Sequence, residues 1–283
     1  KKERMYFIMA KNLYAVIVVG VGGTGSFVAC DLARYLASSA ENIRRTVSIV
    51  LADGDRVEDK NRARQMYYPE DVGLNKADCL AQSINDTFDL DVSSSGRYID
   101  TVDDIAALFR AASSQLKDRA GNSGCDIVPV IVSCVDNVPA RKLMEEYFHL
   151  QNSVIYIDSG NGFSNGQCIY AVKDEGIILS PARDFYGFEF LEEENQKARS
   201  ETSCEELNNV APQHILANRY ASFNILSAIF QLLEGQGIKR GFTTFDAFNC
   251  TSTHVLPEGF GFEVTKEKKR KTKEKKRKKK KED

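Results

Sequence analysis

The stretch that decides the fold is Val16–Ser26, which reads VIVVGVGGTGS. It begins as an apolar run that fits a buried strand and continues into four glycines: Gly20, Gly22, Gly23 and Gly25. After the glycines, apolar residues recur every three to five positions, which is the spacing of an amphipathic helix. Backbone amides and the helix dipole favour phosphate at such a turn, so the stretch predicts a nucleotide-binding site.

The bulk composition predicts a globular domain with a basic tail. The chain has 283 residues, of which 42% are hydrophobic and 28% charged, as is ordinary for a soluble protein. The net charge of -2 hides an asymmetry, because residues 266–283 hold 13 Lys or Arg against four acids and carry +9. Residues 1–265 then carry -11, which argues against a general nucleic-acid surface on the folded part. We therefore expect a domain over 1–265 and a disordered tail, which is the only place where nucleic-acid contact is expected.

The cysteine pattern and the hydropathy favour a cytoplasmic protein. The seven cysteines are odd in number, and no pair has C-x-x-C spacing, which suits reduced thiols better than disulfides. No apolar stretch reaches the roughly 18 residues that a membrane span requires. The apolar run in Lys1–Ala10 is too short for a secretory signal. We expect no membrane association.

The order of the expected elements predicts an α/β, Rossmann-like fold. Strands and helices alternate, so the sheet should be mostly parallel with helices on both faces. Strands are expected at about 14–19, 46–52, 93–99, 126–133, 154–158 and 166–172, and helices at about 26–38, 74–85, 101–117, 139–149 and 212–233. A long crossover loop is expected over 173–208, and a β-hairpin over 241–256 follows the last helix.

Four charged residues follow the glycines at strand ends or on flanking helices. Asp53 could bind ribose hydroxyls, which NAD-dependent dehydrogenases also require. Arg64 and Lys76 could neutralise a triphosphate, and Asp136 offers a hard oxygen ligand for Mg²⁺. Each of the last three residues also has a plainer interpretation: Arg64 as a surface ion-pair residue, Lys76 as an exposed helix charge, and Asp136 as the N-cap of the next helix.

Four blocks in this order carry a family resemblance. They are VGVGGTGS from Val19, ADGDRVEDKNRARQ from Ala52, DVGLNKA from Asp71 and SCVDNVPAR from Ser133. The chain resembles the ThiF/MoeB/ubiquitin-activating-enzyme (E1-like) superfamily, and in detail the small bacterial ThiF-like proteins that include the PRTRC type. The ThiF/MoeB fold also has the long crossover loop and the C-terminal helix and hairpin expected here.

The resemblance implies an adenylyltransferase that uses ATP and Mg²⁺. Its substrate would be the C-terminal glycine of a ubiquitin-like protein, with an E2-like protein or a sulfur-transfer acceptor downstream, and the enzyme would be a homodimer. The four glycines would line the phosphates. Asp53 and Asn61 would bind the ribose and a nearby phosphate, and Arg64 and Lys76 would bind the triphosphate. Gln65 would complete the same motif, and Asp136 would bind Mg²⁺.

One cysteine is a candidate for a second catalytic step. Cys204 lies in the expected crossover loop, where relatives form a thioester with the activated protein, and a thiolate is the competent nucleophile. The adjacent Glu205 and Glu206 would raise its pKa if they lie close. The paired C-x-x-C motifs that hold zinc in many relatives are absent, so no zinc is expected.

Three other functions stay open at this point. An NAD-dependent oxidoreductase would explain the glycines and Asp53 but would leave Arg64, Lys76 and Asp136 without a role. A tRNA-modifying, ThiF-like adenylating enzyme would give the basic tail a purpose. A non-catalytic ThiF-like scaffold subunit would need neither the cations nor the metal ligand.

Overall fold

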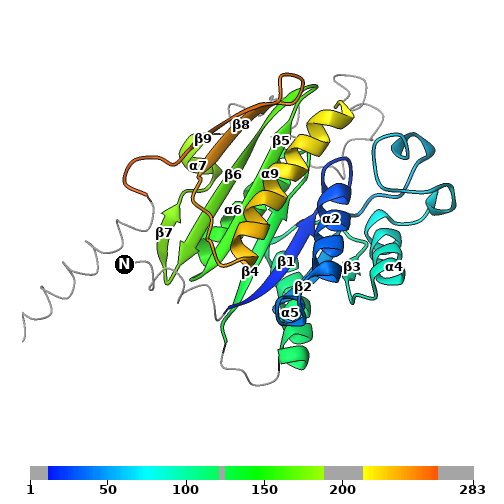
Figure 1. Cartoon of the computed structure of the whole chain (residues 1–283), viewed down its shortest axis with the longest axis horizontal. Coiled ribbons are helices and arrows are strands. Elements are labelled where there is room, and N and C mark those ends of the chain that lie inside the picture. The colour runs from blue at the N-terminus through cyan, green and yellow to red at the C-terminus, as the bar shows by residue number, and fades with distance from the viewer. Residues whose placement is uncertain (1–11, 121–124, 188–212, 261–283) are drawn as a thin grey trace, which may run out of the picture.

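The computed structural model describes residues 12–120, 125–187 and 213–260, and its centre is one β-sheet (Figure 1). Within these ranges nine strands pair in the order β3-β2-β1-β4-β5-β6-β8-β9, with β7 paired to β6. The first five strands along the chain are mutually parallel, and the later strands add antiparallel. Their bounds are β1 Leu13–Val19, β2 Val47–Ala52, β3 Ser93–Ser95, β4 Ile127–Ser133, β5 Val154–Asn161, β6 Asn165–Asp174, β7 Ile177–Ser180, β8 Phe242–Asp246 and β9 Thr251–Val255.

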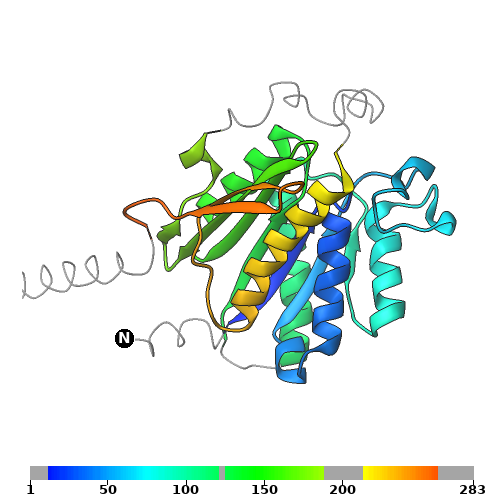
Figure 2. The same cartoon turned by 45° about the horizontal axis from the view of Figure 1, so that its top comes forward.

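Helices cover both faces of the parallel part of the sheet. α2 (Gly25–Ser38), α4 (Lys76–Phe88) and α9 (Ile215–Leu233) lie on one face, and α5 (Val102–Ala120) and α6 (Val138–Leu150) lie on the other (Figures 1 and 2). Short helical turns fill the connections: α3 Glu41–Arg44, η1 Asp59–Asn61, η2 Pro69–Asp71 and α7 Arg183–Tyr186. No described helix combines the length and the apolar character that crossing a bilayer requires.

The alternation of β1 explains the two cores. Val16 and Val18 face the core beneath α2, α4 and α9, whereas Ala15, Ile17 and Val19 face the core beneath α5 and α6. Every residue of β1 is buried, as a central parallel strand covered on both faces requires. The predicted α/β fold with a mostly parallel sheet is therefore confirmed.

The structure corrects the start of the expected crossover loop. Part of the range 173–187 is regular secondary structure: Ile177–Ser180 forms β7, which pairs with β6, and α7 follows. Leu179 and Arg183 are buried there, and the short apolar run was too brief to stand out in the sequence. The remainder of the expected loop, residues 188–208 with Cys204, and the basic tail lie outside the described residues.

Candidate functional site

The candidate site is the edge of the sheet at which the chain leaves both β1 and β4. β1 pairs with β2 on one side and β4 on the other, so the connections after β1 and β4 run to opposite faces, which is where open α/β sheets bind ligands. The Cys134 amide donates to the Val19 carbonyl over 2.9 Å and joins the two strand ends. Figure 2 shows the N-termini of α2 and α9 at this same edge.

Three glycines of the turn are needed because neighbouring backbone or side-chain atoms lie too close to leave room for a Cβ. Gly20 has a φ of +81°, and a Cβ there would lie 2.9 Å from the Cys134 carbonyl oxygen. A Cβ on Gly23 would lie 2.4 Å from Nδ2 of Asn218, and one on Gly25 would overlap the turn itself. At Gly22 the only contact within 4 Å would be Gln65 Nε2 at 3.8 Å. Gly22 therefore borders the open side of the turn.

A substitution at Gly20 tests how much this close approach matters for stability. Gly20→Ala should lower the free energy of unfolding by about 2 kcal/mol or more, because it combines an unfavourable φ with a backbone clash. Gly73→Ala is the matched control: Gly73 has a φ of +90° but nothing within 4 Å of its added Cβ, so it should cost about 1 kcal/mol. Urea unfolding of both variants gives the comparison, and equal losses would contradict the close-approach argument.

The segment that carries Arg64 and Gln65 folds back onto the glycine turn. The Met66 amide donates to Ser26 Oγ over 3.3 Å, and the Tyr67 hydroxyl donates to the Val21 carbonyl over 2.6 Å. Arg64 is half-buried. Asn61 is buried, and its Oδ1 accepts the Glu58 amide over 2.9 Å, so it holds the start of this segment.

Asp53 holds the glycine turn in shape through hydrogen bonds to backbone amides. Its two carboxylate oxygens accept the amides of Val21 (2.8 Å) and Asp55 (2.9 Å), and the residue is buried. Burial raises the pKa of Asp53, while the neighbouring Lys76 and the two amides oppose that shift. The carboxylate predicted to meet ribose is thus also a structural part of the glycine turn.

Lys76 lies in the interior rather than on an exposed helix face. It is 6% exposed, and its Nζ pairs with the Asp55 carboxylate at 2.8 Å. The Tyr98 hydroxyl donates to the other oxygen of Asp55 over 2.7 Å. The interpretation of Lys76 as an exposed helix charge is therefore wrong, because a buried lysine needs an acidic partner and Asp55 supplies it.

Asp136 lies in the loop that follows β4, half-buried beside the glycine turn. It is not the N-cap of α6: the Asn137 Oδ1 accepts the Ala140 amide over 2.9 Å and begins that helix. The alternative interpretation of Asp136 as the cap of α6 is thus wrong. Arg141 donates to the Val135 carbonyl and so fixes the loop from the helix side.

Two groups of polar residues were not singled out from the sequence. Near the turn, the fully buried Asn218 of α9 accepts the Asn161 amide over 2.7 Å and the Thr24 hydroxyl over 3.5 Å. Behind the Asp136 loop, the buried Asp158 pairs with Arg141 and Arg183. Arg141 stands in the SCVDNVPAR block, but nothing local marks Asn218 or Arg183.

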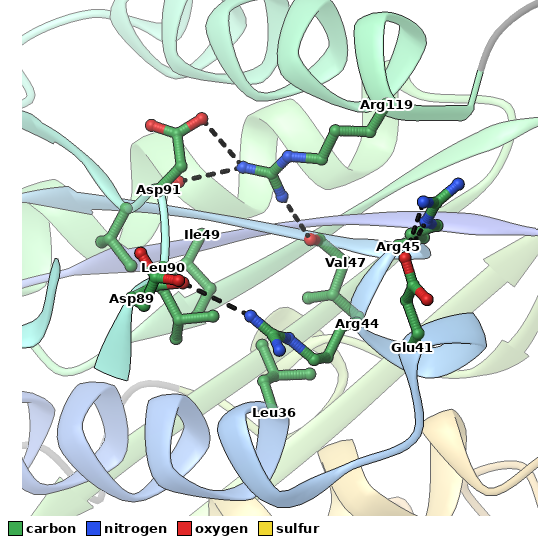
Figure 3. Close-up of a pocket in the computed structure, with 11 residues that line it drawn as sticks. Leu36, Glu41, Arg44, Arg45, Val47, Ile49, Asp89, Leu90, Asp91 and Arg119 are labelled. Carbon is green, nitrogen blue, oxygen red and sulfur yellow. Dashed lines mark hydrogen bonds and ion pairs between the residues drawn. The ribbon is translucent and has the colours of Figure 1, made fainter. Parts of the chain in front are cut away.

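A separate cavity lies at the opposite edge of the sheet. It has a volume of about 460 Å³ and is lined by the start of β2 at Val47 and by the residues that follow α4 (Figure 3). Arg44 donates to the Asp89 carbonyl and Arg119 to Asp91, so the charged rim is bound to protein groups. This cavity does not include any of the predicted site residues.

Part of the chain is similar in sequence to ubiquitin-like modifier-activating enzymes. Ubiquitin-like modifier-activating enzyme 5 of Culex quinquefasciatus is 31% identical over 128 residues, which is 45% of this chain and 29% of the relative. The enzyme of the same name from Oryza sativa subsp. japonica is 31% identical over 134 residues, 47% of this chain and 29% of the relative. The match thus spans less than a third of either relative.

Solved structures show the same fold. A structure of E. coli MccB with ATP has a TM-score of 0.58 at 16% identity and covers 89% of this chain and 65% of MccB. PaaA has a TM-score of 0.53 at 15% identity, with 89% and 66% covered. The sequence model of the ThiF family matches residues 11–259. Because that match spans most of the chain, the protein belongs to the ThiF family.

Proposed function

We propose that this protein uses ATP to adenylate the C-terminal carboxylate of a ubiquitin-like protein. One observation carries the proposal: three segments far apart in the sequence meet at one edge of the sheet. They are the glycine turn after β1, the Asn61–Tyr67 segment that folds onto it, and the Asp136 loop after β4. Family membership supports adenylation as the general reaction.

The residues at this edge fit ATP with Mg²⁺. Two of the first amides of α2, those of Ser26 and Val28, donate to the Gly22 and Thr24 carbonyls, so the start of the helix lies beside Gly22, whose open side would receive a phosphate. Arg64 lies in the segment whose Met66 and Tyr67 contact this turn. Asp136 supplies the oxygen ligand that Mg²⁺ prefers, and the bound ion would offset charge on the phosphoryl oxygens.

The reaction itself is a displacement at phosphorus. The substrate carboxylate oxygen forms a bond to the α-phosphorus while the bond to the β-phosphate oxygen breaks, and pyrophosphate leaves. The glycine turn holds the triphosphate in line with the incoming carboxylate, and Arg64 offsets the charge that the departing pyrophosphate carries. Catalysis on this scheme is positioning plus charge neutralisation.

The test is ATP–pyrophosphate exchange with the full-length protein. Exchange should depend on a ubiquitin-like protein that ends in glycine, and removal of its last glycine should abolish the signal. Two other substrates are tested in parallel: tRNA, and peptides with a free C-terminal carboxylate. The proposed substrate class would be contradicted if tRNA or a short peptide supported exchange and no ubiquitin-like protein did.

A second step would transfer the acyl group to Cys204, which lies outside the described residues. The thiolate would attack the acyl carbonyl and AMP would leave. We expect a reducing-agent-sensitive adduct on SDS gels that Cys204→Ala abolishes, with exchange retained. Cys250→Ala is the control, because Cys250 is an exposed thiol at the β8–β9 turn. An adduct that persists in Cys204→Ala would place the thioester elsewhere.

A further inference from the structure

Three side chains with metal-binding atoms meet at a place away from the glycine turn. Glu145 and His149 are four residues apart on α6 and so lie on one face of that helix, and Asp184 faces them from α7. Their ligand atoms all lie within 4.8 Å of one another. The His149 Nε2 and an Asp184 oxygen are 3.0 Å apart.

We propose that Glu145, His149 and Asp184 form a binding site for a divalent transition-metal ion. One imidazole nitrogen and two carboxylates are a donor set that suits Zn²⁺, Co²⁺ or Mn²⁺. Atoms bound to one zinc ion at about 2.0–2.2 Å in tetrahedral geometry are themselves roughly 3.3–3.6 Å apart, so the His149 nitrogen and the Asp184 oxygen, now 3.0 Å apart, would need to separate only slightly to bind one ion. The set contains no cysteine, so it is unlike the C-x-x-C zinc sites whose motif the chain lacks.

The charges around the three residues favour a cation. Glu145 is buried, and its Oε1 accepts the Asp184 amide over 2.5 Å, which brings two carboxylates together. Asp184 pairs with His149, and the neighbouring Arg183 is bound to Asp158.

The helix end adds to the same preference. His149 lies in the last turn of α6, where the helix dipole favours positive charge. Lys173 Nζ donates to the His149 backbone carbonyl over 2.6 Å and not to its imidazole. A bound ion would tie α7 to α6 and stabilise the native state, because the unfolded chain does not hold the three ligands together.

The test is metal binding by the full-length protein after treatment with a chelator. Titration with Co²⁺ should show one equivalent bound, with visible bands of nitrogen and oxygen ligation and without the charge-transfer band of a cysteine thiolate. Zn²⁺ should compete for the same site and raise the melting temperature. Absence of saturable binding, or a thiolate band, would overturn the proposal.

Variants locate the ion. His149→Ala and Asp184→Asn should each weaken Co²⁺ affinity by at least about tenfold, since loss of an outer-shell partner alone costs about that much. Both side chains are exposed, so these variants should fold. Glu146→Gln, an exposed neighbour on α6, should bind Co²⁺ like the wild type. Unchanged affinity in His149→Ala and Asp184→Asn would exclude this site.

Discussion

Asp136→Ala is expected to reduce ATP–pyrophosphate exchange by at least about 100-fold, the usual cost of removing one group that stabilises transition-state charge. The fold should be unaffected, because Asn137 and not Asp136 caps α6. Asp136→Asn keeps the shape of the side chain but loses its charge, so it should be nearly as inactive. Equilibrium ATP binding, measured in parallel, separates loss of chemistry from loss of affinity.

The control for this variant is Asp118→Ala, which removes an exposed carboxylate on α5. Its exchange rate should equal that of the wild type. Full exchange by Asp136→Ala with a competent substrate would show that the Asp136 loop is not the catalytic centre. Raising the Mg²⁺ concentration should partly restore exchange in Asp136→Asn if that residue contributes one metal ligand among several.

Asp158→Asn should lower the free energy of unfolding by about 3–5 kcal/mol, because it leaves two buried arginines without their counter-charge. Asp158 and Arg183 are fully buried, and the Arg183 Nε donates to the carboxylate over 2.5 Å. Glu41→Gln is the control: it breaks the exposed Glu41–Arg45 pair and should change stability by less than about 1 kcal/mol. Similar small losses in both variants would contradict this account.

The same ion group predicts how stability depends on pH. Burial opposes ionisation of Asp158, but Arg141 and Arg183 hold its pKa below the ordinary value. A carboxyl whose pKa is lowered by folding stabilises the protein above its unfolded pKa, and this stabilisation is lost as the pH falls through the folded value. Asp158→Asn should therefore flatten the acid side of the stability curve, which urea unfolding at pH 3 to 7 would show.

The sequence predicted the parts of the site that depend on local pattern. A strand, a glycine turn and a helix follow from residues within a short window, and β-α-β spacing then places the Asp136 loop beside them. Lys76 was predicted as a cation at the site, but its burial against Asp55 depends on how two loops pack. Asn218 contacts Thr24 across 194 positions of sequence, and no local pattern reports such a contact.

The hydrogen bonds that Asp53 accepts from the glycine turn have a consequence for nucleotide affinity. Since Asp53 already holds the amides of Val21 and Asp55, the turn has its shape before any ligand arrives. A ligand that enters a preorganised turn loses little affinity to ordering the backbone. Loss of this carboxylate would therefore weaken every phosphate ligand alike, whether or not the ligand carries a ribose.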